Sequence, residues 1–257
     1  MIVARGKEMI EMSAEELAEL VSDYCSIAID LGTGDGRFAY SYAGEHPETF
    51  VIGIDPVHGA MRDFSTRARR KPAHGGLPNL LYVTASIEQP PAELEGRCNR
   101  IFVNLPWGSL MRGIIEADET VLGNLDRLAA NDAHLRIILN TRVFDDPVPL
   151  DVQGLPEITV AYAEAVLRPA FSRHGFTLTD ARFLAPEELI DLATTWAKRL
   201  SHRSPPPSFL IEARRNQRSV REKLVSSHAV HHPGPRAADA RQQQPSSSPE
   251  PTDRGSC

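Results

Sequence analysis

A glycine-rich turn directly after a short apolar run is the feature that most constrains how this chain can fold. The run from Ile27 to Leu31 has the length and branched side chains of a buried strand, and residues 30–37 read DLGTGDGR. Glycine adopts positive φ and lets a ligand approach the backbone closely. A strand that ends in such a turn and opens a helix is typical of a nucleotide-binding α/β sheet.

The spacing of these glycines distinguishes between classes of ligand. A dinucleotide fingerprint requires a third glycine five positions after the first, where this sequence has Arg37, and the lysine of a phosphate-binding loop is missing. The spacing here is GxGxG, with Asp30 two residues before Gly32. This pattern favours a cofactor that has an amino-acid portion and no pyrophosphate, namely S-adenosylmethionine (SAM).

Further acidic side chains are expected at the same edge of the sheet. Asp55 follows the apolar run from Phe50 to Ile54, and a carboxylate there can accept hydrogen bonds from both ribose hydroxyls. Glu88 follows the next predicted strand and can accept a hydrogen bond from the adenine amino group. The alternative is that each acid only caps a turn or a helix. Taken with the glycines, the acids predict a SAM site.

The first 215 residues alternate strand-like and helix-like runs. This alternation predicts an α/β fold, with a Rossmann-like sheet of seven mostly parallel strands and helices on both faces. Ser13 and Glu16 form a capping box that opens the first helix. The predicted strands span 27–31, 50–54, 80–84, 100–105, 135–139, 176–183 and 209–213. The predicted helices span 14–24, 38–44, 56–71, 120–130, 162–174 and 186–200.

Composition sets the limits of the folded domain. Residues 216–257 contain no aromatic residue and are rich in Gln, Ser, Pro and His, so they cannot bury enough apolar surface to offset the entropy of ordering. We therefore predict one domain over 1–215 and a disordered tail over 216–257. The first ten residues lack a signal-peptide core, and no apolar run is long enough to cross a bilayer, so we expect a cytoplasmic protein without membrane contact.

The distribution of charged residues and cysteines indicates which kinds of partner and metal site to expect. The net charge of −6 argues against a uniformly basic nucleic-acid binder, yet residues 61–100 carry seven basic side chains against four acidic ones. A basic face on an acidic protein suits docking on a polyanion at one chosen site. The three cysteines lie far apart without metal-ligand spacing, so we expect no metal site.

Two tryptophans, the only ones in the chain, lie beside polar or basic residues. Trp107 follows Asn104-Leu105-Pro106 at the end of a predicted strand, and Trp196 lies in the sequence TTWAKR. Two such rings can hold a flat base between them by stacking, although a single tryptophan more often belongs to a core. We interpret the pair as a nucleobase clamp.

Two basic clusters can contact RNA phosphates. The first is Arg67, Arg69, Arg70 and Lys71, and the second, which flanks Trp196, is Lys198, Arg199 and Arg203. Phosphate contacts of this kind position a protein on RNA without reading its sequence. The alternative for the first cluster is a solvated helix end.

Six motifs together resemble a known family, the aminoglycoside-resistance 16S rRNA (adenine-N1) methyltransferases of the KamB and NpmA type, which are class I SAM-dependent methyltransferases. They are DLGTGDGR (30–37), GIDPV (53–57), KPAHGGLPN (71–79), PWGSL (106–110), GLP (154–156) and WAKRL (196–200). The resemblance implies methylation of N1 of the decoding-site adenine 1408 in the 30S ribosomal subunit, with SAM as methyl donor, and resistance to aminoglycosides.

The predicted site follows from the motifs and the resemblance together. The expected cofactor contacts are Asp30, Gly32, Gly34, Asp55, Glu88, Leu105, Ser109 and Thr194. The expected adenine clamp is Trp107 with Trp196. The expected contacts to 16S rRNA are Arg67, Arg70, Lys71, Arg199 and Arg203.

Three other functions stay open from the sequence. Asn104 gives the turn a partial likeness to the NLPY turn of rRNA adenine-N6 dimethyltransferases, so the exocyclic amine is a possible target. A small-molecule methyltransferase would use the tryptophans to line an apolar pocket. A SAM-dependent RNA-binding module would bind the cofactor and RNA without transferring a methyl group.

Overall fold

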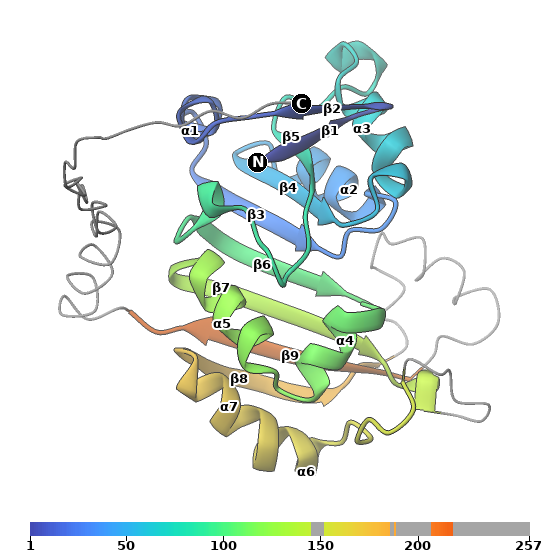
Figure 1. The fold of residues 1–257 in the computed structure, drawn as a ribbon, viewed down its shortest axis with the longest axis vertical. Coiled ribbons are helices and arrows are strands. Elements are labelled where there is room, and N and C mark those ends of the chain that lie inside the picture. The colour runs from blue at the N-terminus through green and yellow to red at the C-terminus, as the bar shows by residue number, and fades with distance from the viewer. Residues whose placement is uncertain (145–151, 186–187, 189–206, 218–257) are drawn as a thin grey trace, which may run out of the picture. The chain divides into compact units, whose positions relative to one another are not determined.

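The computed structural model describes residues 1–144, 152–185, 188 and 207–217 (Figure 1). Residues Met1–Arg218 form one compact unit. Apart from residue 188, the helix predicted over 186–200 lies outside the described residues, and so does the predicted tail apart from Asn216 and Gln217. Among the helices that the structure describes, none has the length and apolar character needed to cross a membrane.

One nine-stranded sheet runs through this unit, in the order β2-β1-β5-β4-β3-β6-β7-β9-β8 (Figure 1). Neighbouring strands from β5 to β7 are parallel, and β9 lies antiparallel between β7 and β8. The strands are β1 (Ile2–Arg5), β2 (Glu8–Glu11), β3 (Ser26–Leu31), β4 (Thr49–Asp55), β5 (Leu80–Thr84), β6 (Cys98–Asn104), β7 (Ala129–Asn140), β8 (Phe176–Phe183) and β9 (Ser208–Arg215). The predicted fold class, an α/β fold with a mostly parallel sheet, is confirmed.

The predicted count of seven strands was two too low, because the N-terminus forms a hairpin. Strands β1 and β2 pair with each other, and Val3 of β1 pairs with Val83 of β5, which extends the sheet at that edge. Each strand has only four residues, too few for an alternating pattern to stand out in the sequence. The hairpin covers the edge of the parallel sheet.

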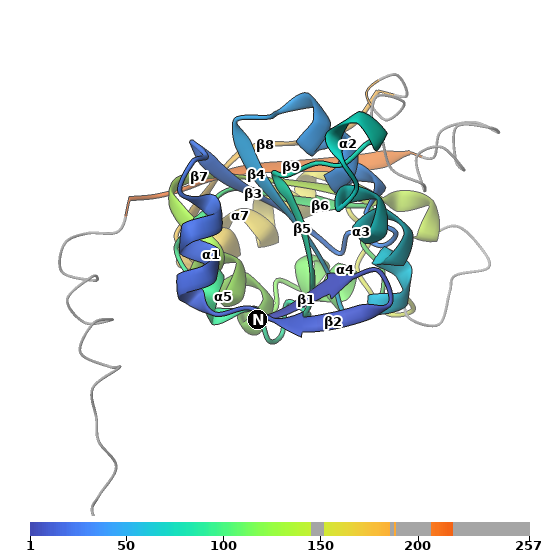
Figure 2. The same ribbon diagram turned by 90° about the horizontal axis from the view of Figure 1, so that it is seen from above.

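The helices lie on both faces of the sheet, as predicted (Figure 2). The α-helices are α1 (Ala14–Val21), α2 (Arg37–Glu45), α3 (Arg62–Ala68), α4 (Gly108–Ile115), α5 (Glu119–Leu128), α6 (Val160–Tyr162) and α7 (Arg168–Arg173). A π-helical stretch, Ala163–Leu167, joins α6 to α7, and short 3-10 turns span His58–Met61, Pro72–His74, Ala92–Leu94 and Thr141–Phe144.

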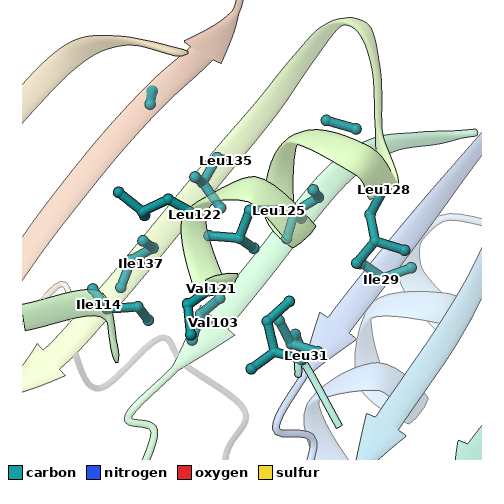
Figure 3. Packing of buried hydrophobic residues seen from close by; sticks show 14 of the residues in the cluster. Ile29, Leu31, Val103, Ile114, Val121, Leu122, Leu125, Leu128, Leu135 and Ile137 are labelled. Carbon is teal, nitrogen blue, oxygen red and sulfur yellow. The ribbon is translucent and has the colours of Figure 1, made fainter. Parts of the chain in front are cut away.

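The larger part of the core lies under α5. Its apolar side chains recur at helical spacing and form a stripe that packs on the central strands, as Figure 3 shows. The contacting side chains are Val121, Leu122, Leu125 and Leu128 of the helix and Ile29, Leu31, Val103, Leu135 and Ile137 of the strands. On the opposite face, alanines of α2 and α3 pack against Val51 and Tyr82, and these small side chains allow a close approach.

Strand order fixes where a ligand can bind. Both β4 and β6 flank β3, so the chain order reverses direction between β3 and β6. In open α/β sheets, ligands bind beyond the carboxyl ends of the strands at such a switch point. The glycine-rich turn follows β3 and the Asn104–Trp107 turn follows β6, so both turns meet there.

Candidate active site

A cavity of about 570 Å³ opens at this switch point. It is lined by four stretches: residues 30–35, 55–57, 85–88 and 104–110, with Phe38 from α2. All of the predicted cofactor contacts within the described residues line it, and so does Trp107. They are Asp30, Gly32, Gly34, Asp55, Glu88, Leu105 and Ser109. The structure therefore brings together residues that are distant in the sequence.

The glycine-rich turn has the backbone conformation that its sequence predicts. Gly32, Gly34 and Gly36 have φ values of 74°, 59° and 86°, in the left-handed region that favours glycine. At Gly36 space is a second constraint, because a Cβ there would lie 2.4 Å from the ring of Tyr82. The Tyr82 hydroxyl donates to the Gly36 carbonyl oxygen at 2.7 Å. Tyr82 thus supports the turn from below.

Asp30 lies beneath the turn, with only 2% of its surface exposed. The Thr33 hydroxyl donates a hydrogen bond to one carboxyl oxygen, and the Asn104 amide donates to the other at 3.4 Å. Burial nevertheless raises the pKa of Asp30 to about 7, and the hydrogen bonds only partly offset it. The group therefore titrates near neutral pH.

Asp55 ends β4, contacts the glycine-rich turn directly and lines the cavity. One of its oxygens accepts a hydrogen bond from the Gly34 N–H at 2.9 Å, and the other accepts one from the Val57 N–H at 2.8 Å. Partial burial raises its pKa despite these bonds. Each carboxylate oxygen accepts two hydrogen bonds, so both can also accept from ribose hydroxyls.

Glu88 and Ser109 lie together on another side of the cavity. The hydroxyls of Ser86 and Ser109 donate to the Glu88 carboxylate and lower its pKa. Ser109 is in the first turn of α4, so this bond links α4 to the segment after β5. A charged, mainly exposed carboxylate at this position is a suitable acceptor for an adenine amino group.

The turn after β6 holds a strained residue and an exposed ring. Leu105 has a φ of 53°, unusual for a residue with a side chain, and its N–H donates to the Ile138 carbonyl oxygen at 2.8 Å. Its side chain packs with Ile138, Leu184 and Leu210, away from the main core. Trp107, directly before α4, is 38% exposed and lines the cavity. A base that enters the cavity can therefore contact this ring.

The first basic cluster is exposed and held in place by α2. The Arg67 guanidinium lies over the ring of Tyr40, 4.7 Å from its centroid. The Tyr40 hydroxyl donates to the Gly75 carbonyl oxygen at 2.5 Å. At Gly76 a Cβ would lie 1.6 Å from the Arg70 carbonyl oxygen, so only glycine fits there. Residues 67–76, named here the basic segment, are thus held in a defined conformation.

The remaining predicted residues lie outside the described part of the chain. They are Thr194, Trp196, Arg199 and Arg203. The base clamp is therefore described on the Trp107 side, and the pairing of the two tryptophans stays a prediction. Within the described residues, no group of three or more His, Cys, Asp or Glu side chains is placed to hold a metal ion.

Sequence reasoning missed several contacts that shape the site, although it had placed Asn104 itself in the turn before Trp107. Thr33 and Asn104 hold Asp30, Tyr82 supports the turn, and Tyr40 holds Arg67. Gly53 of β4 is the one sequence signal for Tyr82, because a Cβ there would lie 2.7 Å from the same ring. A glycine inside a buried strand often marks such a close approach.

The cavity suits a cofactor with a cationic part. The buried amide oxygen of Asn104 has no hydrogen-bond partner among the described residues, and it belongs to a residue that lines the cavity beside Asp30. A cation placed there would lower the pKa of Asp30 and supply a donor for acceptors in this corner. SAM carries both an ammonium group and a sulfonium, so the residues present fit it.

Comparison with known proteins gives the family. Residues 2–215 match the NpmA family of 16S rRNA (adenine(1408)-N(1))-methyltransferases. A curated methyltransferase of that description from Streptoalloteichus hindustanus is 39% identical over 196 residues, covering 76% of this chain and 90% of the relative. One from Escherichia coli is 33% identical over 202 residues, covering 78% and 92%.

Solved structures agree with this assignment. The 16S rRNA methyltransferase KamB superposes with a TM-score of 0.78 at 34% identity, covering 84% of this chain and all of KamB. A tryptophan-to-alanine mutant of the Catenulisporales acidiphilia enzyme with its cosubstrate SAM gives a TM-score of 0.79 at 33% identity, covering 84% of this chain and 97% of that enzyme. This chain belongs to the family of 16S rRNA (adenine(1408)-N(1))-methyltransferases, which use SAM.

Proposed function

We propose that this enzyme methylates N1 of adenine 1408 in the decoding site of 16S rRNA, within the 30S subunit, and thereby gives resistance to aminoglycosides. One observation carries the proposal. The exposed ring of Trp107 lines the same cavity as Asp30 and Asp55. A base stacked on that ring lies beside the methyl group of a cofactor held by the two carboxylates. The enzyme acts in the cytoplasm, where ribosomal subunits are found.

The chemistry needs positioning more than proton transfer. When bound, SAM supplies an electrophilic methyl group on its sulfonium. Neutral adenine N1 has an in-plane lone pair, which forms the new bond to the methyl carbon while the sulfur keeps the electrons of the bond that breaks. No general base is required to begin this attack. Alignment of the reacting atoms can contribute several powers of ten to the rate.

Each residue of the proposed site has a distinct part in this positioning. Asp55 holds the ribose of the cofactor, and Glu88 accepts from its adenine amino group. Asp30 faces the cationic amino-acid portion. Trp107 stacks on the flipped target base, which Trp196 contacts from the other face. Leu105, which precedes Pro106 in a strained turn, sets the direction of the chain into Trp107.

Resistance follows from the product. Methylation at N1 places a methyl group and a positive charge on the edge of the base that faces the drug. An aminoglycoside is itself polycationic, so it meets both a steric block and a like charge.

The basic residues Arg67, Arg70, Lys71, Arg199 and Arg203 contact 16S rRNA phosphates and orient the enzyme on the subunit.

The test is methyl transfer from labelled SAM to purified 30S subunits, followed by primer extension across the decoding site and identification of the methylated nucleoside. We expect a stop one nucleotide before adenine 1408 and 1-methyladenosine in the digest. Recovery of N6-methyladenosine would instead favour the amine as target. Turnover of a small molecule without ribosomes, or SAM binding without transfer to 30S, would contradict the proposal.

A further inference from the structure

A second groove, separate from the cofactor cavity, lies between the N-terminal hairpin and the segment after α3. Its volume is about 290 Å³, and three arginines are among its lining residues: Arg5, Arg69 and Arg70. Leu20, Leu77 and Pro78 contribute apolar walls. Within the described part of the chain, no carboxylate belongs to the lining. The groove therefore combines an apolar wall with three cations.

The hairpin is fixed in the position that brings Arg5 to this groove. The Gly6 N–H donates to the Ser65 hydroxyl of α3 at 2.9 Å, and this bond is buried. Gly6 has a φ of 66°, and a Cβ there would lie 2.6 Å from the Thr66 hydroxyl oxygen, so both the backbone conformation and the space at this turn favour glycine. Figures 1 and 2 both show the turn of the hairpin beside α3.

The three arginines differ from most other arginines of the domain in having no acidic partner. Among the described residues, neither Arg5, Arg69 nor Arg70 forms an ion pair, although Glu8 lies opposite Arg5 in the hairpin register. Elsewhere ion pairs are common. They include Arg112 with Glu116, Arg127 with Glu95, Arg168 with Glu164, Arg182 with Glu188 and Arg215 with Asp126.

Three uncompensated like charges around one groove repel each other, and a bound anion removes that repulsion. Guanidinium groups match the geometry of phosphate oxygens through paired N–H donors. The apolar wall adds a surface for a sugar or a base edge next to the phosphate. These features fit a nucleic-acid backbone better than they fit a small free anion.

We propose that this groove, named here the hairpin groove, binds the phosphodiester backbone of 16S rRNA when the enzyme docks on the 30S subunit. The inference rests on the proposed function. It adds the N-terminal hairpin, and Arg5 in particular, to the docking surface. Arg70 lines the groove and also belongs to the predicted RNA contacts, so the two surfaces are continuous.

The test compares single variants in steady-state methylation of 30S subunits at several salt concentrations. Arg5→Ala and Arg69→Ala should each raise KM for 30S about three- to tenfold and leave kcat and SAM affinity unchanged. The slope of log affinity against log salt should fall by about 0.7 to 0.9 for each arginine removed. Arg5→Lys keeps the charge and should retain most of the affinity.

Arg97→Ala is the matched control, because Arg97 is exposed, lies outside the groove lining and has no ion pair in the described residues. The inference is wrong if Arg5→Ala behaves like this control while the wild-type enzyme methylates 30S normally. Failure of the wild-type enzyme to methylate 30S would instead overturn the proposed function. If Arg5→Ala lowers the melting temperature, Arg5→Gln, which keeps much of the side-chain stem, decides the question by the same criteria.

Discussion

Asp30 is buried beneath the glycine-rich turn, and its protonation state sets how well the cavity holds a cation. Its pKa is raised to about 7 by burial, so the carboxyl is mostly neutral at pH 6 and mostly charged at pH 8. We therefore expect SAM affinity to rise about three- to tenfold between pH 6 and pH 8. Calorimetry across this range measures the change. In Asp30→Asn, the affinity should be lower and nearly independent of pH.

The same titration affects stability with a definite sign. Because the folded-state pKa lies above 3.8, the ordinary value for an aspartate, the folded protein holds this proton more tightly than the unfolded chain. The contribution of Asp30 to stability is then fully present below pH 4 and is lost as the pH rises toward 7. SAM acts in the opposite sense, because it favours the charged form. A pH-independent cofactor affinity in the wild-type protein would contradict this account of Asp30.

Trp107 has an exposed ring beside the cofactor cavity, which a purely structural tryptophan does not need. One base–aromatic stack contributes about 1 to 3 kcal/mol. Trp107→Ala should reduce methyl transfer about tenfold to a hundredfold or more, because misplacement of N1 adds to the lost stacking. Trp107→Phe keeps an aromatic face and should retain more activity, with the same order at Trp196.

Single-turnover assays on 30S subunits measure these effects, with SAM affinity and melting temperature as controls. Both alanine variants should still fold and bind SAM. Full activity in Trp196→Ala would remove that residue from the clamp. Unfolding of Trp107→Ala would show that its ring is needed for packing.

At the scale of elements, Tyr82 of β5 packs closely against two other segments, the glycine-rich turn at Gly36 and strand β4 at Gly53. Its ring leaves no room for a Cβ at Gly36 or Gly53, and its hydroxyl holds the Gly36 carbonyl. Gly36→Ala should destabilise the domain by about 1 to 3 kcal/mol and weaken SAM binding, because both φ and space oppose a side chain. Tyr82→Phe removes only the hydrogen bond and should cost about 1 kcal/mol. Denaturant unfolding with and without SAM measures the loss of stability and of SAM binding in each of the two variants.

Tyr40 of α2 contacts Arg67 and Gly75 in the basic segment, and these contacts predict that Tyr40 positions the segment. Tyr40→Leu removes both the ring under Arg67 and the bond to Gly75, so KM for 30S should rise about threefold to tenfold while kcat changes little. Tyr40→Phe keeps the ring and should show a smaller rise. Steady-state kinetics at low and moderate salt measure both. An unchanged KM in Tyr40→Leu would mean that Arg67 needs no support to contact RNA.

Some elements were predictable and others were not, for identifiable reasons. The capping box at Ser13 is present, and its helix ends at Val21. Helix α4 was missed because Gly108 and Gly113 are poor helix formers. Gly113 is tolerated because a Cβ there would lie 2.4 Å from Val121 of α5, so tight helix packing outweighs propensity. The single helix predicted over 56–71 is instead a 3-10 turn followed by α3, which ends at Ala68.

At the scale of the whole molecule, the cofactor side of the site could be predicted because it is built from turns at strand ends. Asp30 lies near the end of a predicted strand, Asp55 and Glu88 each follow one, and parallel strands bring their carboxyl ends to one edge. The supporting contacts could not be predicted in this way. Tyr82 and Tyr40 act through packing between segments that are distant in the sequence, and no local pattern encodes such pairs.

The last prediction concerns where the functional chain can end. Asn216 still belongs to the domain, because its N–H donates to the Gly175 carbonyl oxygen at 2.7 Å and its side chain pairs with Thr177. The Gln217 amide donates to Asp132 at 3.1 Å. A deletion of residues 219–257 keeps all of these bonds and removes a segment without aromatic residues. It should change the melting temperature by no more than about 2 °C and leave kcat and KM on 30S subunits within about twofold.

The matched control for this deletion begins three residues earlier and removes 216–257. It loses the hydrogen bonds of Asn216 and Gln217 at the end of β9, so it should be less stable by about 1 to 2 kcal/mol. Denaturant unfolding of both truncated proteins measures the difference. A large loss of 30S methylation with unchanged stability in the shorter deletion would mean that the basic groups of the tail contact RNA, since residues 219–257 contain several arginines and histidines.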